Sequence, residues 1–281
     1  MKTLCKIGMV IGILFFYVEV QAMPLITNGL VTAYEFSGNA NDSSPTGNNG
    51  EVFGAQLSTD RFGNANSAYY FDGDDYILAS ASSLPTAERT VSLWFKADTL
   101  SNSYSNNNVL LGYGGEYQWN VGKSWVMQLY QGLAYTSNLD GASYIVQSHW
   151  MTNWLQYYDS QSPVGSWTNY AITTDSSGTK IFINGELKIS NSTFINNTVV
   201  AGKDLSIGIC PDAWGNAPYT SEPGVYFKGS MDDVLIYNRA LSANEINQLA
   251  GGLPVPEPST MFLFVTGIAG LVGSMFRRKK N

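Results

Sequence analysis

Short runs of alternating apolar and polar residues recur through the middle of the chain, separated by clusters of Gly, Asn, Asp and Ser. In the run TVSLWFKAD, this alternation places Val91, Leu93 and Phe95 on one face of an extended segment, because successive side chains of a strand point to opposite faces. The run WTNYAITTD does the same for Tyr170, Ile172 and Thr174. Turn signals at roughly 8–12-residue spacing are typical of β-sandwiches. The pattern predicts an all-β domain.

One hairpin is specified locally by the run KIFINGELKI. Its centre, Asn184 and Gly185, is the residue pair best able to adopt the positive φ angles of a two-residue type I′ turn. We therefore expect two antiparallel strands on either side of this pair.

The run LSANEINQLAGG predicts one short helix near the end of the domain. Ser242 is suited to cap its N-terminus, and Glu245 is placed to reach back as the second member of a capping box. Ile246 and Leu249 form an apolar stripe, and Gly251 ends the helix. We expect this helix to lie on the surface of the sandwich.

The two ends of the chain are predicted to be targeting segments. Lys2 and Lys6 precede an apolar stretch, and small side chains end at Ala22, so residues 1–22 have the features of a cleaved secretory signal peptide. Residues 260–276 are 17 residues without a charge, at the short limit of a transmembrane helix. The basic residues 277–280 follow, which favours a cytoplasmic C-terminus and an exported body.

The exported body, residues 23–253, is acidic. It contains nine Lys and Arg residues against 20 Asp and Glu, a net charge of −11. Such a surface repels nucleic acid and anionic lipid, so neither is an expected partner. After removal of the signal peptide, Cys210 is the sole cysteine, which excludes an intramolecular disulfide. With no repeat and no internal linker, we expect one domain.

The C-terminal segment resembles the PEP-CTERM sorting signal of Gram-negative bacteria that export exopolysaccharide. The resemblance rests on VPEPS, the short apolar span and the basic tail, in that order, within residues 254–281. It implies that Pro256, Glu257 and Pro258 are recognised by an exosortase, which removes the tail from an inner-membrane-anchored precursor. The alternative is an ordinary tail anchor that follows a Pro-rich linker.

The body resembles the LamG-like branch of the concanavalin A-like lectin/glucanase jelly rolls. Three segments carry this resemblance: GLVTAYEF and its continuation to Ile77, residues 165–188, and residues 228–250. It implies a two-sheet antiparallel jelly-roll sandwich in which the two ends of the domain pair in adjacent strands. The loop NANDSSPTGNN would then lie near GSMDD. Residues 102–163 follow the family pattern poorly, and we expect strands with elaborate loops there.

This expected contact suggests a structural Ca²⁺ site, as family members often carry. Asn39, Asn41 and Asp42 offer oxygen ligands, and Asp232 is the expected fourth. Asp232 and its neighbour Asp233 should point to opposite faces of a strand, so only one of them can point inward. The alternative is that Asp42 makes an Asx turn. A separate cluster, Asp72, Asp74 and Asp75, is interpreted as a tight turn.

We expect no catalytic activity. Glucanases of this fold use two carboxylates in a Glu-x-Asp-x-x-Glu arrangement, which the chain lacks, and no Gly-x-Ser-x-Gly elbow occurs. Aromatic rings stack on sugar C–H faces, so Trp119, Trp150 and Trp154 are the candidate carbohydrate-binding residues, with core packing as the alternative. The predicted function is adhesion or carbohydrate binding linked to exopolysaccharide. The alternatives are a matrix protein without a specific ligand and a divergent glycan hydrolase or lyase.

Overall fold

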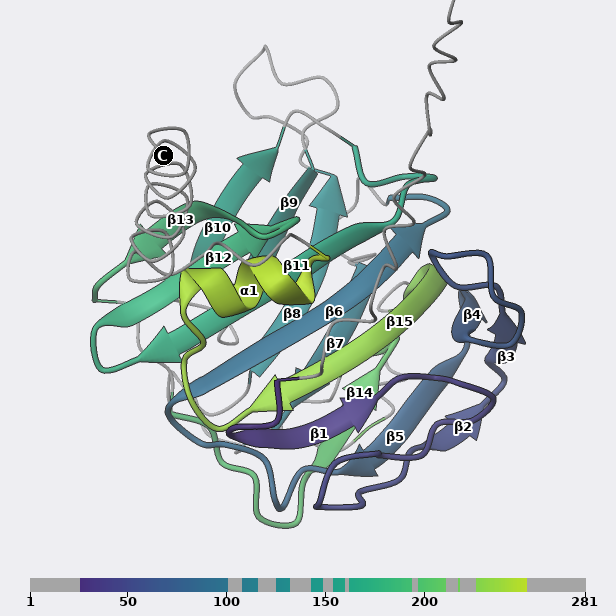
Figure 1. Ribbon diagram of the computed structural model, residues 1–281, viewed down its shortest axis with the longest axis horizontal. Coiled ribbons are helices and arrows are strands. Elements are labelled where there is room, and N and C mark those ends of the chain that lie inside the picture. Colours follow the sequence, from purple (N-terminus) through teal and green to yellow (C-terminus); the bar gives the residue numbers. More distant parts are fainter. Residues whose placement is uncertain are drawn as a thin grey trace, which may run out of the picture.

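The computed structural model describes residues 26–100, 108–115, 125–131, 143–148, 154–159, 162–193, 197–210, 217 and 226–251. In this part of the chain, 15 strands form two antiparallel sheets that pack face to face, with one helix on the outside (Figure 1). The predicted signal peptide and sorting tail lie outside these residues. Across the same described ranges, no helix has the length and apolar character needed to cross a membrane.

The first sheet, here called sheet A, has the strand order β13-β12-β11-β6-β15-β4-β3, and β1 pairs with β15 beside this path. Its strands are β1 (Leu30–Tyr34), β3 (Gln56–Ser58), β4 (Ala68–Asp72), β6 (Arg89–Ala97), β11 (Thr168–Asp175), β12 (Gly178–Ile183), β13 (Glu186–Asn191) and β15 (Lys228–Tyr237). The pairing of β1 with β15, in which Tyr34 lies opposite Val234, confirms that the two ends of the domain are adjacent.

The second sheet, sheet B, has the order β10-β9-β8-β7-β14-β5-β2. Its strands are β2 (Glu51–Phe53), β5 (Tyr76–Ser80), β7 (Asn108–Tyr113), β8 (Trp125–Gln131), β9 (Ser143–Ser148), β10 (Trp154–Asp159) and β14 (Asp204–Ile207). The aromatic-rich region 102–163 thus supplies the four consecutive strands β7 to β10, which form one side of this sheet.

The main hydrophobic core lies between the sheets. Sheet A contributes Val91, Leu93 and Phe95, all fully buried, as the alternation of TVSLWFKAD predicts. Sheet B contributes residues such as Leu111 and Met127, which are also fully buried. Side chains along a strand point alternately to its two faces. The residues that lie between these core residues along each strand therefore point to the outer faces of the sheets.

The predicted hairpin is confirmed. β12 and β13 are joined by Asn184 and Gly185, whose φ angles are 49° and 81°. Gly185 also lies against the helix, because a Cβ at this position would come within 2.9 Å of the Asn247 side-chain nitrogen. The turn therefore needs glycine both for its backbone conformation and for this close approach.

The helix α1 (Ala243–Leu249) is also confirmed, with the predicted capping box between Ser242 and Glu245. It lies across the outer face of sheet A (Figure 1) and buries Ile246 there. A second apolar cluster fills the space between the helix and the sheet. Its buried members are Ala33, Ala171, Phe182, Leu235, Tyr237, Leu241 and Ile246. α1 thus covers part of this outer face.

Candidate functional site

Asp42 is buried in the loop that follows β1, and its carboxylate accepts hydrogen bonds from three backbone N–H groups. These come from Ala33 at 2.8 Å, Ser44 at 2.9 Å and Asn48 at 2.9 Å. The Asn39 side chain accepts from the backbone N–H of Asn41 at 2.8 Å, which is an Asx turn. The loop is therefore held by its own polar side chains.

Asp232 and Asp233 do not point to opposite faces of a regular strand, and that prediction is wrong. The pairing of β15 with β6 shifts between Asp232 and Leu235, and Asp233 has a φ angle of 45°. This bulge changes the direction of the chain, so both carboxylates reach the same guanidinium group, that of Arg61, each at 2.6 Å.

Arg61 fixes the loop of residues 59–67 onto the outer face of sheet A. Its guanidinium carbon lies 4.3 Å from the centre of the Phe62 ring and 4.8 Å from that of Trp94. Asp60 shapes the same loop by accepting from the backbone N–H groups of Phe62 and Asn64, both at 2.8 Å. A cation held between two rings and two carboxylates is a strong anchor.

Burial sets the protonation of Asp232. Desolvation and the neighbouring charge of Asp233 raise the pKa of Asp232 to about 7, although the Arg61 charge opposes the rise. In Asp60, burial also favours the neutral acid, but hydrogen bonds from Asn64 and Phe62 and the charge of Arg61 bring its pKa below the usual value. The Arg61 anchor therefore contains one carboxyl group that titrates near neutral pH.

Three of the predicted calcium ligands, Asn39, Asp42 and Asp232, therefore have other partners. Within the described residues, Asp42 and Asp232 share no hydrogen-bonding partner, and the positive Arg61 occupies the space beside Asp232. This arrangement gives no support to a single ion shared by both carboxylates. Calcium binding stays a prediction.

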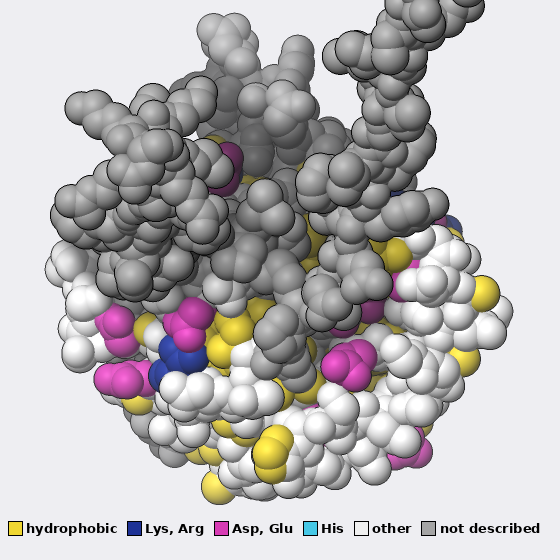
Figure 2. Space-filling view, viewed as in Figure 1, with side chains coloured by type: hydrophobic (Ala, Val, Ile, Leu, Met, Phe, Trp, Pro, Cys, Tyr) yellow, Lys and Arg dark blue, Asp and Glu magenta, His cyan; other side chains and the backbone are white. Residues whose placement is uncertain are grey.

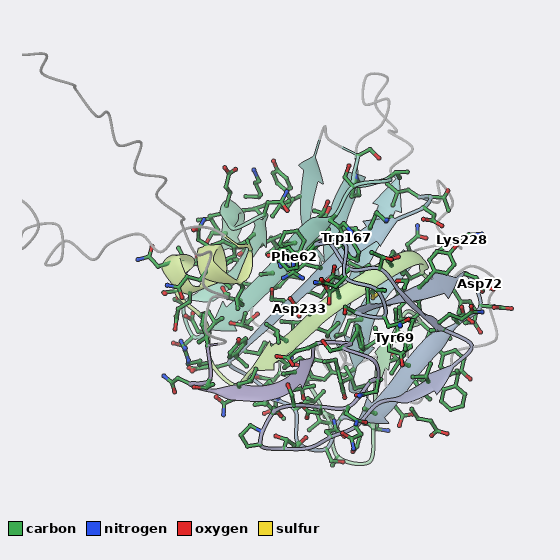
Figure 3. The ribbon with its side chains drawn as sticks, turned by 45° about the vertical axis from the view of Figure 1, so that its right-hand side comes forward. Phe62, Tyr69, Asp72, Trp167, Lys228 and Asp233 are labelled. Atoms are coloured by element: carbon green, nitrogen blue, oxygen red, sulfur yellow. The ribbon has the colours of Figure 1, made fainter. Side chains whose placement is uncertain are left out.

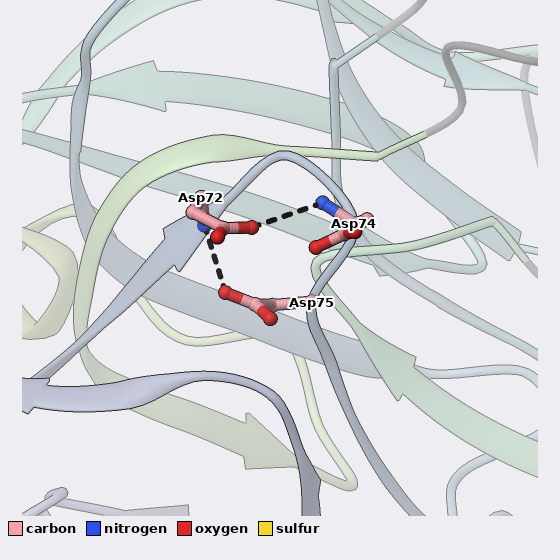
Figure 4. A group of neighbouring side chains, drawn as sticks. All are labelled: Asp72, Asp74 and Asp75. Carbon is pink, nitrogen blue, oxygen red and sulfur yellow. Dashed lines mark hydrogen bonds between the residues drawn. The ribbon is translucent and has the colours of Figure 1, made fainter.

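The acidic cluster Asp72, Asp74 and Asp75 forms the turn between β4 and β5, in agreement with its interpretation as a tight turn (Figure 4). The backbone N–H of Asp72 donates to Asp75 at 2.8 Å. Contact between Asp72 and Asp74 lowers the pKa of Asp72 and raises that of Asp74, while burial raises the pKa of Asp75. These carboxylates shape the turn by bonding to its backbone.

The candidate carbohydrate-binding residues are placed only in part. Trp119 and Trp150 lie outside the described residues, as do Pro256, Glu257 and Pro258. Trp154 begins β10, and only its backbone is described. Their proposed roles stay predictions.

Arg61 has no direct signal in the sequence, because its carboxylate partner Asp232 is 171 residues away along the chain. A local turn signal predicts the loop, because it contains Asp60, Gly63 and Asn64. This signal does not predict which residues the loop contacts. On the face shown in Figure 2, acidic side chains lie at several separate places, with hydrophobic side chains between them.

Two family matches cover most of the chain. Residues 71–247 match the Concanavalin A-like lectin/glucanases superfamily, and residues 254–279 match the PEP-CTERM protein-sorting motif. No curated protein sequence matches the chain.

Solved structures show the same fold. Domain 4 of AbnA, a GH43 extracellular arabinanase from Geobacillus stearothermophilus, in complex with arabinotriose, has a TM-score of 0.58 at 21% identity, covering 79% of this chain and 98% of that one. The botulinum neurotoxin serotype D ligand binding domain in complex with N-acetylneuraminic acid has a TM-score of 0.53 at 18% identity, covering 79% and 50%. The binding domain of Paraclostridial Mosquitocidal Protein 1 has a TM-score of 0.54 at 18% identity, covering 79% and 52%. The chain thus spans about half the length of the two toxin domains.

Proposed function

Because the chain belongs to the Concanavalin A-like lectin/glucanases superfamily, we propose that it is an exported protein that binds carbohydrate without catalysing a reaction. The observation that carries this proposal is the superfamily match over residues 71–247, on a chain folded as a two-sheet sandwich. Two proteins of similar fold were solved with arabinotriose and with N-acetylneuraminic acid, which supports a sugar as the class of ligand.

The proposed route to the surface depends on the sorting motif in residues 254–279. An exosortase recognises Pro256, Glu257 and Pro258 and removes the tail, after the segment 260–276 has anchored the precursor in the inner membrane. The released body then acts at the cell surface or in the extracellular matrix of a Gram-negative bacterium. The coupling of such signals to exopolysaccharide export makes that polymer the proposed ligand.

The absence of catalysis is part of the proposal. The chain lacks the Glu-x-Asp-x-x-Glu string, and two of its buried carboxylates, Asp42 and Asp232, are committed to backbone N–H groups and to Arg61. The competing function is a divergent glycan hydrolase or lyase. Release of reducing ends from a polysaccharide by the purified chain would establish that alternative.

Carbohydrate binding is tested with the full chain on a glycan array, with and without a chelator. We expect binding to a restricted set of glycans. The variant Trp154→Ala tests the predicted platform on β10, and Leu187→Ala, which alters an exposed side chain on β13, is its matched control. A flat array in both conditions would contradict the proposal and favour a matrix protein without a specific ligand.

A structural calcium ion is a separate proposal, made from Asn39, Asn41, Asp42 and Asp232. An ion that binds only the folded chain must raise its melting temperature. We would measure melting of the full chain in millimolar calcium chloride and in EDTA. Equal melting temperatures in calcium and in EDTA would contradict calcium binding. A higher melting temperature in calcium that the variant Asp42→Asn abolishes would support it.

A further inference from the structure

The outer face of sheet A is divided into two parts. Where α1 covers it, the outward side chains are apolar and buried, as Phe182, Leu235 and Tyr237 show. Toward the beginning of β15 and the end of β6, the outward positions instead carry aromatic and polar residues. This second part lies beyond the C-terminal end of α1, where Trp94 donates a hydrogen bond to the Leu249 carbonyl at 3.3 Å.

Strand register places five of these residues in one line across the sheet. Ser230 on β15 pairs with Lys96 on β6 and with Tyr70 on β4, and Tyr70 pairs with Gln56 on β3. Trp167 directly precedes Thr168, which pairs with Phe95, so Trp167 lies beside Lys96. The Lys96 ammonium group is 5.6 Å from the centre of the Trp167 ring. We call these five residues the outer row.

The outer row has the dimensions of an extended ligand. Neighbouring strands are roughly 4.8 Å apart, so four spacings give a row of about 19 Å. Trp167 stands at one end and Tyr70 three strand spacings away. Both rings are half-buried, which holds them in place and leaves part of each ring in contact with solvent.

Hydrogen-bonding groups lie between and beside these rings. Gln56 is exposed, and the Tyr70 hydroxyl donates to the Asp98 carboxylate at 2.9 Å. Ser230, which lies between Lys96 and Tyr70, is buried with 5% of its surface exposed and forms the floor of the row. Sugars offer apolar C–H faces to rings and hydroxyls to such polar groups. Figure 3 shows Trp167 near the middle of the sheet, with Lys228 and Asp72 together where β15 begins.

The loop of residues 59–67 borders the outer row. Arg61 ties this loop to Asp232 and Asp233, two and three residues along β15 from Ser230. Phe62 projects from it with 72% of its surface exposed. The row thus lies next to a raised aromatic side chain that the Arg61 anchor holds in a fixed position.

Charge indicates the kind of sugar. Lys96 forms no ion pair with any residue in the part of the chain that the structure describes, although the body has a net charge of −11. A cation that has no carboxylate partner among the described residues of an acidic protein is complementary to a negatively charged ligand.

We infer that the outer row binds an extended polysaccharide that carries carboxylate groups, with a uronic acid residue opposite Lys96 and sugar rings stacked on Trp167 and Tyr70. This inference rests on the proposed function, which it deepens by naming a surface and a substrate class. It places the ligand on sheet A, whereas the candidate Trp154 belongs to sheet B.

The test uses the full chain and calorimetric titration with hexamers of galacturonic, glucuronic and mannuronic acid, and with cellohexaose as the neutral probe. At least one uronate hexamer should bind, more weakly as salt is added, because exposed charges are screened. Lys96→Gln should weaken this binding about tenfold, and Trp167→Ala by a similar factor, as expected for the loss of one charge or ring contact.

Lys180→Gln is the matched control, because Lys180 lies toward the opposite end of sheet A, where it pairs with Thr173 and Thr173 pairs with Thr90. It should bind as the wild type does. Melting temperatures show whether Trp167→Ala folds, and Lys96→Gln changes a surface charge without altering the core.

The outcomes separate the two proposals. If the wild type binds glycans but Lys96→Gln and folded Trp167→Ala bind them equally well, the outer row is not the binding site and the proposed function stands. Equal affinity for cellohexaose and the uronates would also overturn the inference. If the wild type binds no glycan in the titrations or on the array, both proposals fall.

Discussion

At the scale of single residues, the contact of Arg61 with Asp232 and Asp233 shows how a bulge can bring two neighbouring carboxylates to one cation. Asp232 is 3% exposed, and a buried carboxylate is costly unless it is paired. Arg61 offsets part of this cost, but the pKa of Asp232 still rises to about 7. Asp232 therefore helps to anchor the loop of residues 59–67, but its burial makes the folded protein less stable at higher pH.

This predicts a pH dependence that Asp232→Asn should reduce. Between the usual value of 3.8 and about 7, folded Asp232 holds a proton that the unfolded chain has lost, so stability falls as pH rises through this window. The melting temperature of the wild type, measured from about pH 5 to about pH 8, should decline more than that of Asp232→Asn.

Glu35→Gln, which alters an exposed carboxylate, is the control and should follow the wild type. Parallel melting curves for the wild type and Asp232→Asn would show that Asp232 does not titrate in this range.

Residues such as Arg61 show what the sequence could not predict. The loop of residues 59–67 has a recognisable turn signal, but its ion pair depends on strand register and on a bulge, which no local pattern specifies. The same holds for the outer row. Alternation predicts that Trp94 and Lys96 point away from Phe95, but not which residues of β15 and β4 lie beside them.

At the scale of elements, the most local signals were the most informative. The Asn184-Gly185 hairpin and the Ser242 capping box were both confirmed, because each depends on residues within a few positions of one another. Arg239 adds to the helix by an ion pair with Glu245, which lowers the pKa of Glu245 to about 2. The sequence did not predict this contact.

Removal of the helix cap should weaken the domain. Ser242→Ala deletes the hydroxyl that accepts from the Glu245 backbone N–H, so we expect the free energy of unfolding to fall by about 1 kcal/mol, as for other N-cap serines. Urea denaturation of both proteins measures the change. Ser242→Thr keeps a hydroxyl at the cap and should lose much less; an equal loss in the two variants would mean that the cap contributes little.

At the scale of the whole molecule, the two-sheet sandwich and the adjacency of the two ends of the domain followed from the family resemblance and not from composition or periodicity. Alternation indicates how many strands exist and which faces they bury, whereas the pairing of β1 with β15 joins segments about 200 residues apart. The candidate site was less predictable than the fold, because it depends on such pairings at each position.

The sorting signal gives a prediction for the whole chain. Glu257→Gln in the Pro256-Glu257-Pro258 motif should block removal of the tail, because the proposed exosortase would no longer recognise it. The variant should then accumulate in the membrane fraction with the mass of the uncut precursor, measured by mass spectrometry. Glu51→Gln, in the exposed edge of β2, is the control and should be cut normally. Normal processing of Glu257→Gln would contradict the proposed role of this residue.

The position of β15 has a consequence for how the protein is made. This strand is synthesised after every other strand of the described chain, yet it lies between β6 on one side and β4 and β1 on the other. Until it is in place, each of these neighbours has an unpaired edge, and such edges associate with other extended chains. A polypeptide truncated before Lys228 would keep these strand edges unpaired, so sheet A can close only after the whole domain has been translated.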